Sequence, residues 1–401
     1  MILTTLTLGA LLSAPPTAPE PVSDLLALRV GRAETIANGT IENAVILIEG
    51  GEIVIVGEDL PIERGIPTID LPDAVVMPGM INCRSRLGLD SRAGTVTAPQ
   101  IIAGQELVPG DTSYQALAEY GITTVGLYPP GRGVMGQATA VQTGPGELVL
   151  DDSAYLAMTM AADRNSKNTI RKALDQVADY LEDVEKDRKK WKEKREKSKK
   201  KDDDEVFEPE VPDEDVLPLL RFVTGELRGQ FSINKSADLL HLWDVLADQE
   251  TVRYDIHIQL RDDLDLFYIK EQIGERELRV ICDPEITAHP GTRRERNLPA
   301  ELAEAGAHLA FVPRSASSLT SHRDWRMHVG ELVAYGLDRQ VALRALTLEP
   351  AHALDMGDHL GSLEAGKRAD LLIFDGDPFE TTTKLQAVLV AGDLVHGELY
   401  Q

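Results

Sequence analysis

The chain has few cysteines, few aromatic residues and a deficit of positive charge. Its 401 residues include only two cysteines, Cys83 and Cys282, and both lie in apolar runs that predict strands, which argues against a disulfide framework. Aromatic residues make up 5% of the chain, which argues against stacking surfaces for bases or sugars. The formal net charge is −25. We therefore expect no nucleic acid and no anionic membrane as a partner, because both require clustered positive charge.

The N-terminal apolar run is short. Residues 1–14 cannot span a bilayer as a stable helix, so no membrane span is expected. Small and proline-rich residues follow as far as Pro21. This pattern predicts a signal peptide and proline-rich leader over residues 1–22, and hence an exported protein, periplasmic or extracellular. No basic residue lies near Met1, so a misassigned start of the chain is the alternative explanation.

Short β-rich runs lie at both ends of the chain. They cover residues 44–49, 52–56, 369–374 and 388–393. Gly50-Gly51 separates the first two runs, a pattern typical of a tight hairpin. We therefore predict one small β-sandwich that is built from residues 24–78 and 356–401.

The middle of the chain, residues 79–355, alternates strand-like and helical patterns. The predicted strands are residues 75–81, 123–127, 231–234, 254–260, 278–282 and 308–312. The predicted helices include residues 113–120, 237–247, 264–273, 299–305 and 323–335. Such alternation is typical of an α/β fold, and we predict a TIM-like (β/α)8 barrel with the β-sandwich appended.

A charged insertion, residues 163–215, interrupts this alternation. Between Glu182 and Glu205, 21 of 24 residues are charged, 11 of them basic and 10 acidic. Helix formers dominate and glycine and proline are absent from that stretch. The pattern predicts a solvated helix or a flexible excursion, and the alternative is a docking surface for an acidic partner.

Three further segments carry recognisable motifs. They are VVMPGMIN at residues 75–82, GITTV at residues 121–125, and ALTLEPAHAL at residues 345–354 followed by LGSLEAGKRADL at residues 360–371. In this order and spacing they resemble the amidohydrolase superfamily, near imidazolonepropionase and dihydroorotase. The resemblance implies a distorted TIM-like barrel with a composite β-sandwich, and hydrolysis of non-peptide C–N bonds. It also implies one or two divalent metals that activate water, with a carboxylate on the last strand as proton acceptor.

The resemblance places the family's D-x-H-x-H element at residues 82–86, where this chain has Asn82, Arg84 and Arg86. Alternating residues of a strand face the same side, so the family's two histidines would bind one metal. Guanidinium groups have no lone pair to donate and stay positively charged. A shifted alignment does not explain the difference, because all nine histidines lie at or after His241.

The last predicted barrel strand shows a second difference from the family. The resemblance places Arg314 where the family has its proton-accepting aspartate. An arginine stays protonated at any accessible pH and cannot act as a general base. Near residues 229–234, Ser232 and Asn234 are poor metal ligands. The sequence therefore predicts that the metal site has been lost and that no cofactor is bound.

A rebuilt metal site is the alternative hypothesis. His257 on the strand predicted at residues 254–260, with His289 and Asp283 from a proline-bounded polar loop, would then hold zinc or another divalent metal. The chain would in that case be an active amidohydrolase. Otherwise His257 is a hydrogen-bonded structural histidine and the loop has no metal.

The arginines themselves allow two interpretations. In the first, Arg84, Arg86 and Arg314 line the barrel mouth and bind a carboxylate or phosphate of a small anionic molecule. In the second, they fill the space of the lost metals and pair with nearby acidic residues, namely Asp90, Asp283 or Glu285. We therefore predict a non-catalytic or impaired family member that binds a small anion or acts as a scaffold. It would be a homo-oligomer or pair with an active relative.

Overall fold

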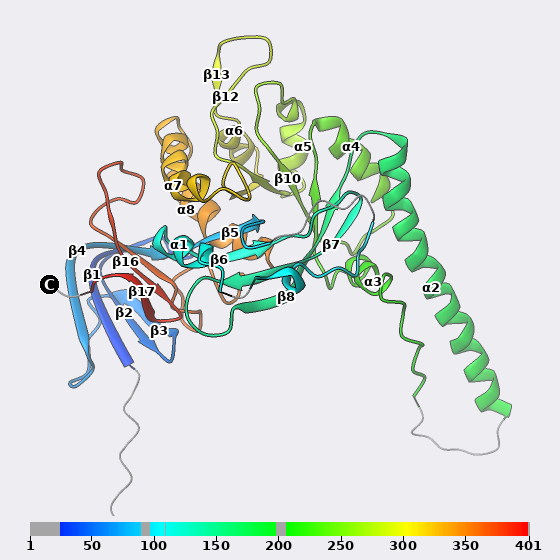
Figure 1. Cartoon of the computed structure of the whole chain (residues 1–401), viewed down its shortest axis with the longest axis horizontal. Helices are drawn as coiled ribbons and strands as arrows, with labels where there is room; N and C mark the ends of the chain where they lie inside the picture. The colour runs from blue at the N-terminus through cyan, green and yellow to red at the C-terminus, as the bar shows by residue number, and fades with distance from the viewer. Residues whose placement is uncertain (1–24, 90–96, 109, 198–205, 400–401) are drawn as a thin grey trace, which may run out of the picture.

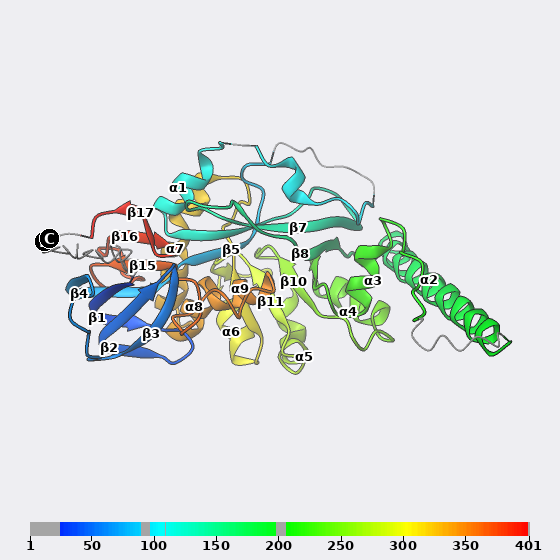
Figure 2. The ribbon, with the colours of Figure 1, turned by 90° about the horizontal axis from the view of Figure 1, so that it is seen from below.

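The computed structural model describes residues 25–89, 97–108, 110–197 and 206–399. The predicted signal peptide at residues 1–22 and Asp90 lie outside these residues. The described chain forms an elongated body that contains two large sheets, and one long helix projects from its end (Figures 1 and 2). None of the described helices is long and apolar enough to cross a membrane.

Strands from both ends of the chain form one seven-stranded sheet, in the order β17-β16-β15-β4-β1-β2-β3. The sheet curls so that the β2–β3 turn meets the far end of the same sheet, where the Ala369 N–H donates to the Gly51 carbonyl at 2.8 Å. Its strands are β1 (Leu25–Glu34), β2 (Thr40–Glu49), β3 (Glu52–Glu58), β4 (Thr68–Pro78), β15 (Leu371–Phe374), β16 (Leu385–Val390) and β17 (Asp393–Gly397). Inward residues such as Leu28, Ile46 and Leu371 are fully buried and hold the two chain ends together through an apolar core.

The Pro-Gly turn joins this sheet to the second one. β4 pairs with β15 as far as Pro78, and the Gly79 N–H donates to the Asp370 carbonyl at 2.9 Å. A Cβ atom at Gly79 would lie 2.1 Å from the Thr123 hydroxyl oxygen. Glycine is therefore required here, because the backbone passes directly against the neighbouring strand.

The second sheet has eight strands in the order β14-β11-β10-β9-β8-β7-β6-β5. They are β5 (Met80–Ser85), β6 (Ile122–Leu127), β7 (Val134–Gln142), β8 (Val149–Thr159), β9 (Gly229–Ser232), β10 (Tyr254–Ile258), β11 (Arg279–Cys282) and β14 (His308–Phe311). β5 and β6 are buried at every position, as expected of parallel strands that are covered on both faces. A small hairpin of β12 (Thr287–Ala288) and β13 (Glu295–Arg296) lies apart from both sheets.

The mixed α/β fold is confirmed, but the strict alternation of a (β/α)8 barrel fails between β6 and β8. These strands follow one another without a helix and pair antiparallel, whereas β5 with β6 and all pairs from β8 to β14 are parallel. The short loop at residues 128–133 returns the chain at once, with Gly131 and Gly133 at positive φ. Parallel pairing needs a longer crossover than this loop provides.

Helices cover the parallel strands β9 to β14 on one side (Figure 2). Besides α2 (Arg164–Lys197), the described helices are α1 (Ser113–Glu119), which packs on β6 and β17 instead, α3 (Leu217–Val223), α4 (Ser236–Val245), α5 (Lys270–Gly274), α6 (Leu298–Glu304), α7 (Leu319–Ala334), α8 (Arg339–Leu346) and α9 (Leu348–Ala353). Two 3-10 turns are η1 (Ala103–Glu106) and η2 (Leu266–Ile269). Side-chain caps fix several starts: the Asp338 carboxylate accepts the N–H groups of Gln340 and Val341 at 2.9 and 3.0 Å.

The described residues of the charged insertion contain one helix, α2 (Arg164–Lys197), of 34 residues, which projects from the body (Figures 1 and 2). Only Ile170, Ala173 and Val177, near its start, are buried. Its outer part carries exposed ion pairs between residues three or four positions apart, such as Lys186 with Glu182 and Asp183. The solvated helix that the sequence predicted is therefore present.

Candidate functional site

The carboxyl ends of the parallel strands meet at one edge of the eight-stranded sheet. Arg84 lies near the end of β5, Ser232 ends β9, and Asp283 and Val312 directly follow β11 and β14. In barrels of parallel strands this edge forms the mouth, where the loops build the pocket. We call this edge the barrel mouth.

Arg84 is the centre of the barrel mouth. Its side chain is buried, with 6% of the residue exposed. Its guanidinium donates from Nη1 to Gln230 Oε1 at 2.5 Å and from Nη2 to Ser232 Oγ at 2.8 Å. The guanidinium carbon also lies 3.9 Å from the ring centroid of Tyr128, which is a cation–π contact. No described carboxylate forms an ion pair with Arg84, so its positive charge is held by neutral groups alone.

Asn82, at the family's aspartate position, ties β5 to helix α7. Its Nδ2 donates to His322 Nε2 at 2.9 Å, and its Oδ1 accepts the backbone N–H of Arg84 at 3.0 Å. His322 Nδ1 lies 2.8 Å from the Ser318 carbonyl, so Nδ1 carries the proton and Nε2 accepts. Burial lowers the pKa of His322, which is consistent with this neutral imidazole. Asn82 therefore positions the backbone from which Arg84 extends.

The structure brings Arg86 to Arg84 but places Arg314 in an ion pair. The Arg86 guanidinium carbon lies 5.7 Å from the same Tyr128 ring centroid. The Arg86 N–H donates to the Ala316 carbonyl at 2.8 Å, which brings the loop after β14 beside the end of β5. Within that loop, Arg314 Nε lies 3.3 Å from Glu285 Oε2. Arg314 thus agrees with the pairing interpretation, whereas Arg84 and Arg86 both contact Tyr128.

The three candidate metal ligands make separate contacts. His257 Nδ1 lies 3.3 Å from Ser232 Oγ, and burial followed by the charge of Arg84 lowers its pKa well below 6.5. The Asp283 carboxylate accepts the N–H of Leu260 at 2.7 Å, and burial raises the pKa of Asp283 to about 6. His289 packs its ring 5.2 Å from that of Phe267. Across the described ranges, no group of three or more His, Cys, Asp or Glu residues is placed to hold a metal ion.

Sequence reasoning missed the residues that hold Arg84. Ser232 was considered only as a metal ligand, although its hydroxyl and the Gln230 amide oxygen suit a guanidinium. Tyr128 was missed as well, although it directly follows a buried strand, as barrel-mouth residues do. A second tyrosine, Tyr155, donates to the Cys83 carbonyl at 3.1 Å beneath the site.

A cavity of about 700 Å³ opens beside this centre. Polar groups line much of it, including those of Arg132, Thr159, Ser166, Ser232 and Asn234. The Ser232 hydroxyl links the two features, because it lines the cavity and accepts a hydrogen bond from Arg84. The volume is within the range of small-molecule sites.

Comparison with known proteins agrees with this architecture. The amidohydrolase family model matches residues 315–396. An N-substituted formamide deformylase from Arthrobacter pascens is 48% identical over 59 residues, and an imidazolonepropionase from Geobacillus sp. is 38% identical over 77 residues. These matches cover 14% and 19% of this chain but only 11% and 18% of the two relatives, so they are local.

Solved structures extend the similarity over the whole fold. An amidohydrolase from Thermotoga maritima matches with a TM-score of 0.75 at 18% identity, over 93% of this chain and all of that one. A prolidase in complex with N-methylphosphonate-L-proline matches with a TM-score of 0.56 at 16% identity, over the same shares. The fold is therefore that of solved amidohydrolases, and the C-terminal segment resembles the amidohydrolase family. The predicted resemblance to this superfamily is thereby confirmed, on the C-terminal motif segment and on the fold.

Proposed function

We propose that this amidohydrolase-superfamily protein has lost its metal centre, is non-catalytic or strongly impaired, and binds a small anionic molecule at the barrel mouth. We further infer that the eight-stranded sheet corresponds to the superfamily's TIM-like barrel, with the β7–β8 hairpin in place of helical crossovers. The single observation that carries the functional proposal is the buried guanidinium of Arg84, which has no described counter-ion.

The side chains at the family's metal positions do not fit a metal. Arg84 and Arg86 offer N–H donors and positive charge where the family has two imidazoles, and neither offers a lone pair. Arg314, at the position of the proton-accepting aspartate, is a cation paired with Glu285. These side chains therefore supply neither a metal ligand nor a general base for hydrolysis.

The burial of Arg84 favours an anion as the occupant. Removing a charge from water costs several kcal/mol. Hydrogen bonds to neutral groups and one cation–π contact offset only part of this cost. A carboxylate or phosphate beside Ser232 would reach the guanidinium edge and offset the remaining cost. The adjacent polar cavity has room for such a molecule.

The proposal is tested by metal analysis together with thermal unfolding. We expect purified protein to contain well under one equivalent of zinc, and inorganic phosphate or malonate to raise its Tm by a few degrees at saturating concentration. An excess of about 100 times Kd corresponds to about 2.7 kcal/mol. Arg84→Met should remove this Tm increase because it removes the charge but keeps an apolar side chain of similar length.

Arg29→Ala is the control, because Arg29 is an exposed arginine on β1 that pairs with Asp70, outside the barrel mouth. It should leave the Tm increase unchanged. Near-stoichiometric zinc, with hydrolytic activity that disappears in His257→Ala or His289→Ala, would overturn the proposal in favour of a rebuilt metal site. A Tm increase that persists in Arg84→Met would overturn the assignment of the anion to this arginine.

A further inference from the structure

A second cavity lies at the opposite ends of the same strands. Its lining includes Tyr254, Arg279 and His308, which are the first residues of β10, β11 and β14, and Arg228, which directly precedes β9. Ser232, the partner of Arg84, is the last residue of β9. Because β9 rises about 3.3 Å per residue, its two ends are about 10 Å apart. The cavity, of about 700 Å³, is therefore separate from the barrel mouth.

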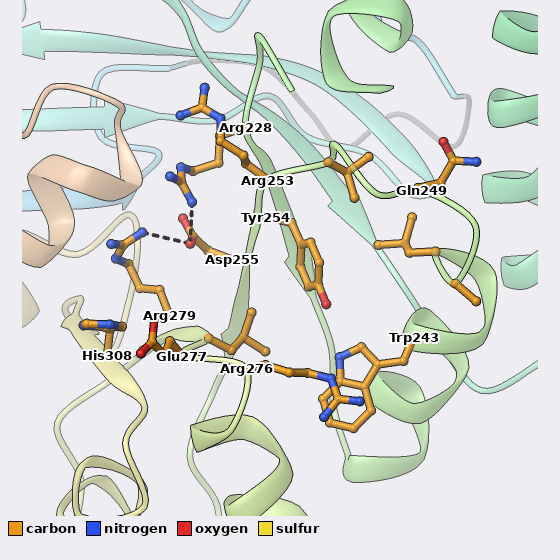
Figure 3. A pocket seen from close by; sticks show the side chains of 14 residues that line it. Arg228, Trp243, Gln249, Arg253, Tyr254, Asp255, Arg276, Glu277, Arg279 and His308 are labelled. Carbon is orange, nitrogen blue, oxygen red and sulfur yellow. Dashed lines mark hydrogen bonds and ion pairs between the residues drawn. The ribbon is translucent and has the colours of Figure 1, made fainter. Parts of the chain in front are cut away.

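Guanidinium groups gather around this cavity (Figure 3). The lining contains four arginines, Arg228, Arg253, Arg276 and Arg279, and two carboxylates, Asp255 and Glu277. Two carboxylates from outside the lining also pair with these arginines, Asp355 with Arg253 at 2.8 Å and Glu349 with Arg279 at 3.2 Å. The arginines therefore recommend this cavity by the donors that these pairs leave over, and not by an excess of charge.

Buried carboxylates hold two of these arginines in fixed positions. Asp255, which is 1% exposed, accepts from Arg228 Nη1 at 3.1 Å and from Arg279 Nη1 at 3.0 Å through the same oxygen. Glu349 accepts from Arg279 Nε at 3.2 Å. Each guanidinium has five N–H groups, so these contacts orient the side chains and leave further donors. Within the described part of the chain, Arg228 Nε has no hydrogen-bond partner.

An aromatic wall faces the arginines. The Arg276 guanidinium lies across the Trp243 ring, with its carbon 4.1 Å from the ring centroid (Figure 3). Tyr254 stands beside them and packs edge-on against Phe231, with the ring centroids 5.9 Å apart. Burial raises the pKa of Tyr254, so its hydroxyl remains a neutral donor at physiological pH. Flat rings and guanidinium donors together are suited to a flat ligand with an acidic group.

We propose that this cavity, at the amino ends of β9, β10, β11 and β14, binds a small flat molecule that carries a phosphate or carboxylate group. The acidic group lies among Arg228, Arg253 and Arg279, and the flat part lies against Trp243 and Tyr254. The volume is in the range typical of small-molecule sites. The site does not depend on the proposed function of the barrel mouth.

Titration calorimetry on the full chain tests the proposal with three probes: phenyl phosphate, inorganic phosphate and phenol. We expect phenyl phosphate to bind at least tenfold more tightly than inorganic phosphate, and phenol not to bind. Arg276→Ala and Trp243→Leu should each weaken phenyl phosphate about tenfold. Arg276 is exposed, so its replacement should leave the fold intact, which circular dichroism verifies.

Two controls separate this site from the barrel mouth. Arg261→Ala removes an exposed arginine elsewhere on the surface, and Arg84→Met removes the buried one. Neither should change the affinity for phenyl phosphate by more than about twofold. The proposal is overturned if inorganic phosphate binds as tightly as phenyl phosphate, if neither cavity variant weakens binding, or if Arg84→Met abolishes it.

Discussion

The carboxyl group of Asp283 provides a quantitative test of the environment at the carboxyl end of β11. The residue is 3% exposed, and its carboxylate accepts the N–H of Leu260 at 2.7 Å. Burial raises the pKa of Asp283 from 3.8 to about 6, against the opposing effect of the Leu260 N–H, and the charge of Glu285 raises it further. The folded chain therefore holds this proton more tightly than the unfolded chain does.

The sign of the effect on stability follows from this difference. A group whose folded pKa exceeds its unfolded pKa stabilises the folded state most below the unfolded value, here 3.8. That contribution is lost as the pH rises through the folded value of about 6. A shift of this size corresponds to about 3 kcal/mol.

Asp283→Asn removes the titration but retains an oxygen that accepts the Leu260 N–H. We expect the free energy of unfolding of this variant, relative to the native chain, to increase by about 2 kcal/mol between pH 4 and pH 7, since part of the full effect already lies below pH 4. Histidines that titrate in the same range are present in both chains and cancel in the difference. Urea unfolding, followed by circular dichroism at several pH values, measures this difference in the free energy of unfolding.

Asp262→Asn is the matched control for this substitution. The Asp262 carboxylate is exposed and accepts a backbone N–H from Ala288 at 2.8 Å, so the variant reports the same chemical change without burial. The reasoning is refuted if the stability difference for Asp283→Asn stays constant from pH 4 to pH 7, or if it decreases as the pH rises.

Two further predictions concern buried groups. Burial raises the pKa of Cys83 to about 12 and also raises the pKa of Cys282. Neither thiol should therefore react with iodoacetamide at pH 8 until the chain unfolds. Rapid labelling of the native protein, detected by mass spectrometry, would contradict this prediction. Asn82→Ala leaves His322 Nε2 and the Arg84 N–H without partners and should lower the free energy of unfolding by about 2–4 kcal/mol, a value measured by urea unfolding. A loss below about 1 kcal/mol would show that these two hydrogen bonds contribute little.

Most strands of the eight-stranded sheet could be predicted, because each is a short apolar run between turn residues. β7 and β8 could not. β7 is buried throughout, yet it contains Gln137, Thr139 and Gln142, which break the apolar pattern. Local partners satisfy these groups: Gln137 Oε1 accepts from Ser153 Oγ at 2.6 Å, and Gln142 Nε2 donates to the Pro145 carbonyl at 2.7 Å. Such hydrogen bonds allow polar residues in a core, but the sequence alone does not predict which partners form them.

The candidate site was predictable only where it is local. The period of two along β5 predicted that Arg84 and Arg86 share one face, and both meet Tyr128. The partners of Arg84 come from β9, far along the chain, and no sequence pattern specifies which strands become neighbours. Gln230 is fully buried between apolar residues, where a polar side chain normally signals a paired group.

Charge at the barrel mouth favours the proposed loss of the metal over a rebuilt metal site. Two guanidiniums supply the same formal charge as one divalent ion, but they offer no coordination position for water or substrate. Burial and the charge of Arg84 lower the pKa of His257, and the same charge would repel a cation bound to this histidine. The same field would stabilise an anion, so under the proposed loss of the metal the arginines would still attract a carboxylate or phosphate.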